Sequence, residues 1–563
     1  MHTQLSELMQ AALLEIVDEP TKGRLENWPI TISIPNNETY GDYATNLAMT
    51  LAKELKQSPL KIAESLVSRV PADLPWLEKI EVVKPGFINF FLNAAVLQNN
   101  LPDLIRLRTA YGQSRHGEGQ KVLLEFVSAN PTGPLHIGHG RGAALGGALA
   151  NLLKAAGYEV TSEYYLNDLG TQMETLGRSI QARFQEIQGS DQPFPENGYK
   201  GEYIKDLAAK ILKEQTAPDH PSEEPDLPFF SRYGREAILN EIQEDLEAFG
   251  IHFDSWFSEE SLVQQGKVEA LLEKMKGLGL LYQEEGALWF KSQAFGDEKD
   301  RVVIRAKGAL TYFASDIAYH FDKFKRGYQT LINIWGADHH GYVPRLKASL
   351  QSLGHSPDSL TVILVQLVTL IRGGKPVAMS TRAGEFITLK EVLDEVGTDA
   401  ARYIFLTRRS DSSLDFDLDL AKKQSSENPV YYVQYAHARV CSVLAMAQSQ
   451  GFSLEDWDPA CLQRLNLPEE RRLCKLLMDY PEEIRQATLK LEPHRLPFFL
   501  GELAAQFHYY YNHCRIIQED RELSQARLIL SQAVGTVIRN ALTLLGVSAP
   551  EKMIRNHEET ATL

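Results

Sequence analysis

The chain has 563 residues, of which 44% are hydrophobic and 23% charged, and its formal net charge is −16 at pH 7. This length predicts about three to four domains, and the acidic balance excludes a protein that coats nucleic acid through a broad positive field. No apolar run approaches the roughly 20 residues of a membrane span, and the four cysteines form no C-x-x-C pair, so neither a thiolate zinc site nor a disulfide framework is expected.

Residues 1–110 are predicted to form a small α/β module. The first helix lacks the basic and apolar blocks of a signal peptide, so no signal peptide is expected. The residue patterns predict a helix over 5–17, a helix over 59–70 that Ser58 and Pro59 start, and a hairpin of residues 80–83 and 87–92.

A polar, glycine-rich linker at 111–120 leads to a second domain, predicted over 118–425, and helical patterns from Asn428 predict a third over 426–563. The second domain begins with a βαβ unit, which is typical of an open parallel sheet. Its predicted elements are a buried strand at 122–127, a small-residue helix at 140–158, a strand at 158–166, and further α/β segments at 330–341 and 361–374. Residues 190–230 are rich in proline and acids and are predicted to form a loop or insertion.

The loop of residues 129–139 lies between the first strand and the first helix of this domain, where α/β proteins bind ligands. His136 and His139 would place two imidazoles at a helix N-terminus beside free backbone N–H groups, which suits a polyphosphate. Gly138 would let a flat base lie against the backbone. Alternatively, the glycines and prolines only shape a loop and each histidine is a surface residue.

A dinucleotide-binding fingerprint is the main competing interpretation of this loop. Residues 138–143 satisfy G-x-G-x-x-A, and Glu159 follows at the expected spacing. The fingerprint requires its first glycine directly after the strand, whereas ten residues separate Val127 from Gly138. We therefore reject a dehydrogenase.

Residues 125–139, EFVSANPTGPLHIGH, resemble the signature of arginyl-tRNA synthetases, including the HIGH motif of class I synthetases. The resemblance covers nearly the whole chain. Residues 41–46 and 85–90 resemble the family's N-terminal additional domain, residues 379–384 its second ATP loop, and the helical remainder its anticodon-binding domain. It implies a multidomain α/β fold with a Rossmann-type parallel-sheet catalytic domain, a small α/β N-terminal domain and an all-α C-terminal domain.

The resemblance implies ATP-dependent attachment of L-arginine to tRNA(Arg) through an arginyl-adenylate, with AMP and diphosphate released. It implies catalytic roles for His136, His139 and Arg382. It implies ATP contacts by Ala129, Asn130, Pro131, Thr132, Gly133, Pro134, Leu135, His136, Ile137, Gly138, His139, Asp338, His339, Lys375, Met379 and Ser380. Mg²⁺ is expected with ATP, held by phosphates and water rather than by a protein cage. No zinc and no protein metal site are expected, because Asp338, His339 and His340 are too close in sequence to face one ion.

The second ATP loop departs from the family pattern. Residues 378–382, AMSTR, align with K-M-S-K-S and lack both lysines. Arg382, Lys375 and Lys121 are the cations that could reach the diphosphate, although a lone cation of this kind is more often a solvated surface charge.

A guanidinium presents five donors and stays charged, so its pocket needs carboxylates. Glu125 and Asp316 are the candidates, and Tyr312 lies one helical turn from Asp316. By resemblance, Glu125, Tyr312 and Asp316 bind the arginine side chain, while Ser128 and Asn130 hold the α-amino group. Without the resemblance, Asp316 could as well be a helix cap.

The C-terminal helices carry aromatic and basic residues that could stack on splayed RNA bases or form a helical core. They are Tyr431, Tyr432, Tyr435, His437, Arg439, Phe507, His508, Tyr509, Tyr510, Tyr511, Asn512 and Arg515. The resemblance assigns this domain to the anticodon loop and the N-terminal module to the outer corner of the tRNA. It also implies that tRNA is bound before arginine is activated.

The expected partners are tRNA(Arg), L-arginine and ATP, without a membrane, for a cytoplasmic monomer with a disordered tail at 554–563. The alternatives are another class I synthetase or a non-catalytic tRNA-binding paralogue. A cysteinyl enzyme would need a zinc-bound thiolate site, and a glutamyl enzyme a basic pocket.

Overall fold

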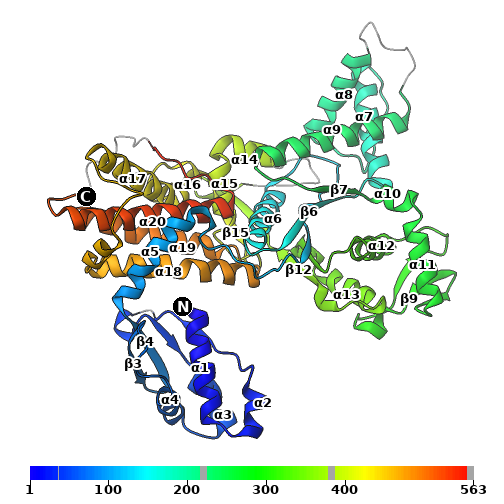
Figure 1. The fold of residues 1–563 in the computed structure, drawn as a ribbon. Coiled ribbons are helices and arrows are strands. Elements are labelled where there is room, and N and C mark those ends of the chain that lie inside the picture. The colour runs from blue at the N-terminus through cyan, green and yellow to red at the C-terminus, as the bar shows by residue number, and fades with distance from the viewer. Residues whose placement is uncertain (36, 216–224, 378–386, 554–563) are drawn as a thin grey trace.

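A computed structural model describes residues 1–35, 37–215, 225–377 and 387–553 of the chain. Figure 1 shows a small N-terminal module beneath a helical bundle, a sheet domain beside the bundle, and two lobes that extend from the sheet domain. The expected multidomain α/β fold, with a parallel sheet and a helical C-terminal part, is confirmed.

The N-terminal module is an antiparallel four-stranded sheet, in the order β1-β2-β4-β3, with helices packed on it. The predicted first helix and the hairpin are confirmed, and the predicted second helix ends at Val67 rather than at residue 70. The elements are α1 (His2–Ile16), α2 (Glu19–Leu25), β1 (Ile32–Ser33), η1 (Glu38–Tyr40), β2 (Tyr43–Thr45), α3 (Leu47–Leu55), α4 (Pro59–Val67), β3 (Leu77–Val83) and β4 (Phe87–Leu92).

Helix α5 (Ala94–Leu107), which the sequence pattern did not predict, carries the chain from this module into the helical bundle (Figure 1). The Gln98 amide donates to the Leu465 carbonyl at 2.8 Å, and the Tyr111 hydroxyl, just after η2 (Arg108–Ala110), donates to the Leu477 carbonyl at 2.8 Å. The N-terminal module is therefore attached to the bundle by a packed helix.

The central sheet consists of five parallel strands in the order β12-β11-β5-β6-β7. The strands are β5 (Lys121–Glu125), β6 (Glu159–Leu166), β7 (Ser255–Ser258), β11 (Thr330–Gly336) and β12 (Leu360–Val365). From β5 the chain adds strands first on one side and later on the other, so the strand order reverses at β5. Such a reversal opens a crevice at the carboxyl ends of the strands, where ligands of open α/β sheets bind.

Helix α6 (Ile137–Ala155) completes the predicted βαβ unit and lies close to the sheet because its contact residues are small. A Cβ added to Gly146 would lie 2.2 Å from the Phe126 ring, and one added to Gly140 would lie 2.6 Å from Leu389. The Arg141 guanidinium donates to the carbonyls of Gln366 and Arg409, each at 2.8 Å. Substitution of Gly146 would push α6 away from the crevice.

Three helices form an arm that projects from the sheet domain (Figure 1). They are α7 (Thr171–Ile187), α8 (Glu202–Gln215) and α9 (Leu227–Ala248). The prediction of a loop over 190–230 is wrong for α8 and for the start of α9. The proline and acid content of the flanking residues obscured apolar residues at helical spacing, because Ile204, Ala208 and Ile211 are buried along one face of α8.

The second lobe lies between β7 and β12 in the sequence and has its own apolar core. It contains an antiparallel sheet in the order β10-β9-β8 and the helices around it. The elements are α10 (Glu259–Gln264), α11 (Lys267–Gly277), β8 (Leu281–Glu284), β9 (Ala287–Phe290), η3 (Ser292–Phe295), β10 (Arg301–Ile304), α12 (Tyr312–Lys325), η4 (Ala337–Tyr342), α13 (Val343–Ser352) and η5 (Pro357–Ser359).

A small three-stranded sheet and the helical bundle complete the chain. The small sheet and its helices are β13 (Val368–Arg372), β14 (Lys375–Pro376), α14 (Leu389–Val396), α15 (Thr398–Phe405), β15 (Leu414–Asp417) and α16 (Leu418–Lys422). The bundle consists of α17 (Pro429–Ser449), η6 (Pro459–Arg464), α18 (Pro468–Leu489), α19 (Arg495–His513) and α20 (Arg521–Leu545). The predicted helical C-terminal part is confirmed as far as Leu545, whereas residues 546–553 are not helical. The tail predicted at 554–563 lies outside the described residues.

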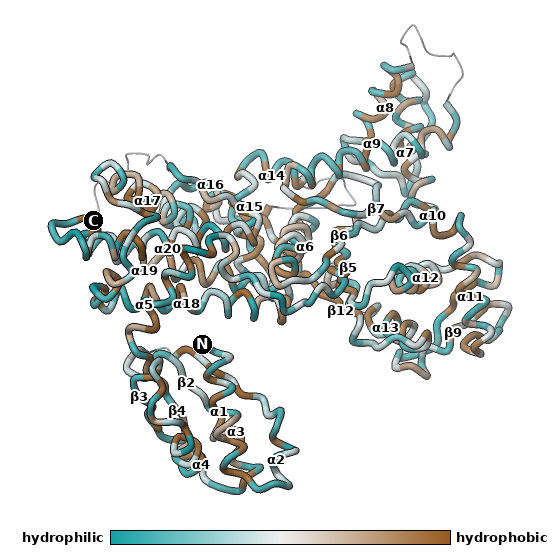
Figure 2. Tube along the Cα trace, in the orientation of Figure 1, coloured by the Kyte–Doolittle hydropathy of each residue, from teal (hydrophilic) through white to brown (hydrophobic). Residues whose placement is uncertain are grey.

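Helix α20 is the one described helix whose length and composition would allow it to cross a membrane, although no apolar run had suggested one. Within its most apolar stretch, 72% of the residues are buried. Figure 2 shows hydrophobic segments recurring along the bundle helices, with α20 among them. The apolar character of α20 is that of a core helix in this bundle.

Candidate active site

A cavity of about 330 Å³ opens at the carboxyl ends of β5, β6 and β11 and is closed on the other side by α10, α12 and η4. Six residues that the sequence singled out line this cavity. They are Glu125, Ser128, Asn130, Tyr312, Asp316 and His339. The structure thus brings together the entire set predicted for arginine, from segments nearly 200 residues apart in the sequence.

The Glu125 carboxylate at the end of β5 already has an internal counter-ion. The Lys323 ammonium, fully buried on α12, lies 2.5 Å from Glu125 Oε2 and 3.3 Å from Asn333 Oδ1. The Asn333 amide is in turn 2.8 Å from His320 Nε2. A buried charge requires such a partner, so Glu125 contributes little net charge to the cavity.

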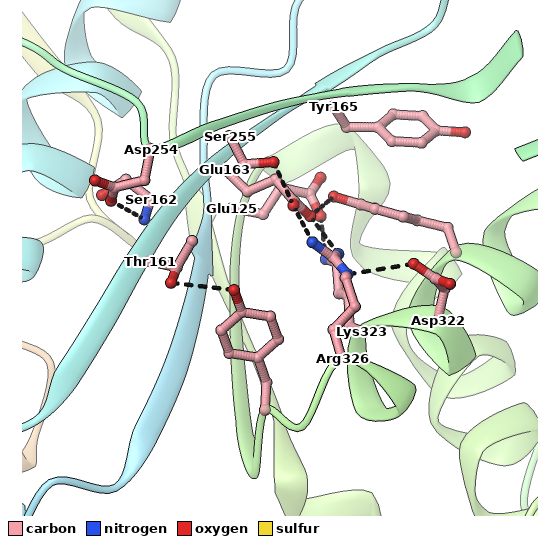
Figure 3. Close-up of polar contacts among 12 residues, drawn as sticks. Glu125, Thr161, Ser162, Glu163, Tyr165, Asp254, Ser255, Asp322, Lys323 and Arg326 are labelled. Carbon is pink, nitrogen blue, oxygen red and sulfur yellow. Dashed lines mark hydrogen bonds and ion pairs between the residues drawn. The ribbon is translucent and has the colours of Figure 1, made fainter. Parts of the chain in front are cut away.

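A second buried carboxylate, Glu163 on β6, is also fully engaged (Figure 3). The Arg326 guanidinium donates to both of its oxygens, at 2.5 and 2.9 Å, and the hydroxyls of Tyr319 and Ser255 donate at 2.7 and 2.9 Å. Burial alone would raise the pKa of Glu163, but the Arg326 hydrogen bonds and the neighbouring cations lower it. Glu163 therefore ties the sheet to α12.

Two other carboxylates in the cavity lack such compensation. Asp316 accepts a hydrogen bond from the Tyr342 hydroxyl, and neither Asp316 nor Glu259 has an ion-pair partner among the described residues. Burial raises the pKa of Asp316 to about 7, against the Tyr342 hydrogen bond and with further repulsion from Glu259 and Glu125. Burial also raises the pKa of Glu259, and no described residue hydrogen-bonds to its buried Oε2. The cavity thus favours a cation.

The loop after β5 starts with two strained residues. Val127 and Ser128 have φ values of 67° and 43°, a region where non-glycine residues cost about 1–3 kcal/mol each. Their conformation turns the Ser128 hydroxyl into the cavity, where its oxygen lies 3.4 Å from Glu125 Oε1 and accepts from the Tyr165 amide at 3.2 Å. The strain therefore places a polar group at this cavity.

The two histidines of the loop stack at the N-terminus of α6, with ring centroids 3.7 Å apart. The Gly138 amide donates to His136 Nδ1 at 3.1 Å, and the His136 amide donates to His139 Nδ1 at 3.3 Å. Burial lowers the pKa of both rings, that of His139 to about 3. Because both Nδ1 atoms accept hydrogen bonds, the proton of each neutral ring is on Nε2.

Neighbouring elements hold the rest of the predicted loop, residues 129–135. The Tyr164 hydroxyl of β6 donates to the Ala129 carbonyl at 2.9 Å, and the Tyr203 hydroxyl of the helical arm donates to the Thr132 carbonyl at 2.7 Å. The Leu389 amide donates to the Leu135 carbonyl at 2.7 Å. The loop thus bridges the sheet, the arm and α14.

The remaining candidates are less uniformly placed. Asp338 and His340 lie on exposed η4, outside the cavity lining that includes His339. Lys375 is exposed on β14. Lys121 lies at the amino end of β5, 3.6 Å from Glu159, whereas the crevice lies at the carboxyl ends of the strands. Lys121 therefore does not reach the site. Met379, Ser380 and Arg382 lie outside the described residues.

Several cavity residues had no sequence signal of their own. They are Tyr165, Asn167, Glu259, Tyr319, His320, Trp335 and Tyr342. The run of alternating residues at 158–166 could have indicated Tyr165, because alternate residues of a strand share a face. Glu259 follows a short strand that the pattern did not predict, so nothing marked it.

The aromatic residues of the bundle divide between core and surface. His437, Phe507, His508 and Tyr510 are buried, as a helical core requires. Tyr509 and Tyr511 are 50% and 37% exposed, and Asn512 and Arg515 are exposed beside them. Among the described residues, no group of three or more His, Cys, Asp or Glu side chains is arranged to hold a metal ion.

Three family models match the chain in sequence order. They are the arginyl tRNA synthetase N-terminal domain at residues 3–92, the class I (R) tRNA synthetase catalytic domain at 100–414, and the DALR anticodon binding domain at 433–553. The matched catalytic segment contains the cavity and the loop.

Similar proteins carry the corresponding names. An arginine–tRNA ligase of Syntrophotalea carbinolica is 53% identical over 526 residues, which cover 93% of this chain and 95% of that protein. One from Legionella pneumophila is 46% identical over 561 residues, with the same coverage of both chains. A Campylobacter jejuni structure assigned as an arginyl-tRNA synthetase is 39% identical, has a TM-score of 0.75, and covers 82% of this chain and 100% of its own. A Thermus thermophilus arginyl-tRNA synthetase structure, 24% identical with a TM-score of 0.78, covers 98% and 100% and shares the fold.

Proposed function

The chain belongs to the class I arginyl-tRNA synthetases, and from that membership we propose which residues bind each substrate. The protein is an arginine–tRNA ligase. The arginine carboxylate attacks the α-phosphate of ATP and diphosphate leaves. The terminal ribose hydroxyl of tRNA then attacks the arginyl carbonyl carbon and AMP leaves. Such chemistry needs positioned reactants and stabilised charge more than covalent help from the protein.

The cavity between β5 and α12 is the arginine site. Two carboxylates without an ion-pair partner among the described residues, the half-buried Asp316 and the buried Glu259, face one space, and this observation carries the proposal. A guanidinium supplies the planar set of donors and the permanent charge that both require. Tyr312, at the start of α12, borders the same space. Glu125, neutralised by Lys323, shapes and orients the site.

Ser128 and Asn130 hold the α-amino group. The Ser128 hydroxyl has one hydrogen to donate and two lone pairs, and the Tyr165 amide takes one lone pair. The second can accept from an ammonium, and the Asn130 side chain lines the cavity beside it. This end of the cavity joins the loop, so the arginine carboxylate would lie next to the ATP phosphates.

The loop of residues 129–139 binds ATP, and His136 and His139 stabilise the transferring phosphate. Both rings are neutral with the proton on Nε2, so each offers a donor at the N-terminus of α6. Neutral donors strengthen as negative charge develops in the transition state. Arg382 is proposed as the catalytic cation of the second ATP loop, with Lys375, Met379, Ser380, Asp338 and His339 as further ATP contacts.

Mg²⁺ accompanies ATP in this proposal and is held mainly by phosphates and water, which this ion commonly retains. The proposed domain limits are residues 1–110, 118–425 and 426–563. The family matches at 3–92, 100–414 and 433–553 support three domains in this order but assign residues 100–110 to the second. The packing of α5 on the bundle favours ending the first domain before α5.

The exposed residues around Tyr509, Tyr511 and Arg515 contact the anticodon loop, and the N-terminal module contacts the tRNA corner. The protein acts as a cytoplasmic monomer.

The deciding experiment is to charge total tRNA with each amino acid in separate reactions with ATP and Mg²⁺. Arginine alone should be accepted, because the cavity offers carboxylates to a guanidinium. Lysine is the most informative competitor, since it has the charge without the planar fork. Acceptance of another amino acid would point to a different synthetase, and no charging at all would point to a tRNA-binding paralogue.

A further inference from the structure

The helical arm α7–α9 contacts the ATP loop through Tyr203. Tyr203, in the first turn of α8, donates its hydroxyl to the Thr132 carbonyl at 2.7 Å. A Cβ added to Gly133 would lie 3.1 Å from the Tyr203 hydroxyl and 3.2 Å from its ring. The ring and the hydroxyl therefore lie directly against residues 132 and 133 of the loop.

The arm is built to hold Tyr203 in this place. A Cβ at Gly201 would come within 2.4 Å of the Tyr203 ring, so the preceding turn accommodates the ring only with glycine. The Tyr199 amide donates to the hydroxyl of Ser179, buried on α7, at 2.9 Å. Burial raises the pKa of the Tyr203 hydroxyl, which stays protonated as a donor. The segment before α8 is thereby fixed to α7, and α7 packs along α9.

The loop depends on such outside contacts because its own backbone has few donors. Pro131 and Pro134 have no N–H, and within the loop the Thr132 amide donates to the Asn130 carbonyl at 2.7 Å in a tight turn. The Tyr203 hydroxyl then restrains the carbonyl that follows this turn. Without it, the backbone around Thr132 and Gly133 would gain freedom.

We propose that Tyr203 is a positioning residue for ATP, through which the helical arm holds the loop in its ATP-binding conformation. The proposal rests on the proposed role of residues 129–139 in binding ATP. It gives the arm a function in the first step of the reaction, the attack of the arginine carboxylate on ATP. Because the contact lies on the loop and not in the acidic cavity, its loss should weaken the use of ATP and leave arginine recognition intact.

The test compares Tyr203→Phe with Tyr233→Phe as a matched control. Tyr233 is on the same arm, and its hydroxyl bonds to Glu214 at 3.0 Å, away from the loop. Initial rates of arginine attachment are measured with tRNA present at varied ATP and varied arginine. Tyr203→Phe should raise the KM for ATP about three- to tenfold, as expected for one hydrogen bond, with the KM for arginine within about twofold. Tyr233→Phe should leave both unchanged.

A purely structural role makes a different prediction. If Tyr203 only stabilises the arm, Tyr203→Phe would lower the Tm more than Tyr233→Phe does, and both KM values would change together or neither would. Tyr203→Ala removes both the ring and the hydroxyl, whereas Tyr203→Phe removes the hydroxyl alone. The Tm lost in Tyr203→Ala should be regained in Tyr203→Phe, while the KM for ATP should stay raised in both variants. A wild-type KM for ATP together with a wild-type Tm in Tyr203→Phe would overturn the proposal.

His136→Ala is measured in parallel to separate this proposal from the one on which it rests. Normal activity of His136→Ala would refute the ATP role of the loop. A strongly impaired His136→Ala together with an unchanged KM for ATP in Tyr203→Phe would refute the role of Tyr203 alone.

Discussion

The ATP loop at 129–139 and the acidic cavity meet at the carboxyl end of β5, yet they hold their polar groups differently. The loop is contiguous, and its side-chain donors are the neutral rings of His136 and His139, placed by backbone hydrogen bonds. The cavity collects side chains from six elements and keeps two carboxylates, the half-buried Asp316 and the buried Glu259, without an ion-pair partner among the described residues.

This difference follows from the charge of the two ligands. A polyphosphate is bound well by fixed dipoles at a helix N-terminus, which carry no counter-charge that must be buried. A guanidinium needs negative charge, and an uncompensated buried carboxylate is stable only when the surroundings enforce it. The Lys323–Glu125 and Arg326–Glu163 pairs form these rigid surroundings (Figure 3). Substitutions in the loop should therefore impair the use of ATP, whereas substitutions in the cavity should impair the binding of arginine.

The largest expected effect is in the loop. His139→Ala removes one donor to the transferring phosphate and should lower kcat for arginine-dependent ATP–diphosphate exchange, measured with tRNA present, by about 10²–10³-fold. Arginine affinity, measured by calorimetry, should stay near that of the wild type. His252→Ala, at an exposed histidine, is the control. Near-normal exchange in His139→Ala, or an equal loss of arginine affinity, would break the division between the two regions.

The second-largest effect is expected for a substitution in the cavity. Glu259→Gln keeps the shape of the side chain and removes its charge, so the KM for arginine should rise about 10- to 100-fold, the range for a hydrogen bond to a charged group. The KM for ATP should change little. Glu260→Gln is a matched control, because the neighbouring Glu260 points to Arg235 at 3.0 Å outside the cavity. If both variants had the same arginine KM, Glu259 would not be a substrate ligand.

The same contrast explains how much of the site the sequence could predict. The loop was predictable because its histidines, glycines and prolines are adjacent in sequence and follow a strand. Asp316 and Tyr312 were assigned through the family resemblance, and their spacing of one turn on one helix agreed with it. Glu259 was not, since its place beside Asp316 depends on how β7 and α10 pack, and no local spacing encodes that packing.

Two helices, α5 and α8, were not predicted, for a related reason. Apolar runs and turn residues marked the N-terminal hairpin and every strand of the central sheet except β7, and these elements were found. Helix α5 was missed because its polar residues Gln98 and Asn100 bond to partners in the bundle and on Tyr111, which only the tertiary structure shows. Helix α8 was obscured by its proline-rich neighbours.

The smallest predicted effect is a pH dependence of arginine binding, which arises in the cavity and not in the loop. Asp316 has a pKa of about 7 because it is buried. Glu125 on β5 and Glu259 on α10 repel its charge, whereas Lys323 on α12 and the Tyr342 hydroxyl on η4 favour it. Arginine needs the ionised carboxylate, so affinity is full above pH 7 and is lost as pH falls through 7. Between pH 8 and pH 6 the Kd should rise about tenfold, as for one group titrating near 7.

Calorimetry in two buffers of different ionisation enthalpy tests this by counting protons. Arginine binding should release almost no proton at pH 8 and close to one at pH 6, because at pH 6 most Asp316 carboxyls must lose a proton before the guanidinium binds. Asp316→Asn should bind more weakly and without proton release across this range. His139 cannot mimic the signal, because its pKa is about 3, and burial also lowers the pKa of His136. Absence of proton release at pH 6 would mean that Asp316 is already ionised in the free protein, and the cavity would then hold a full negative charge before arginine enters.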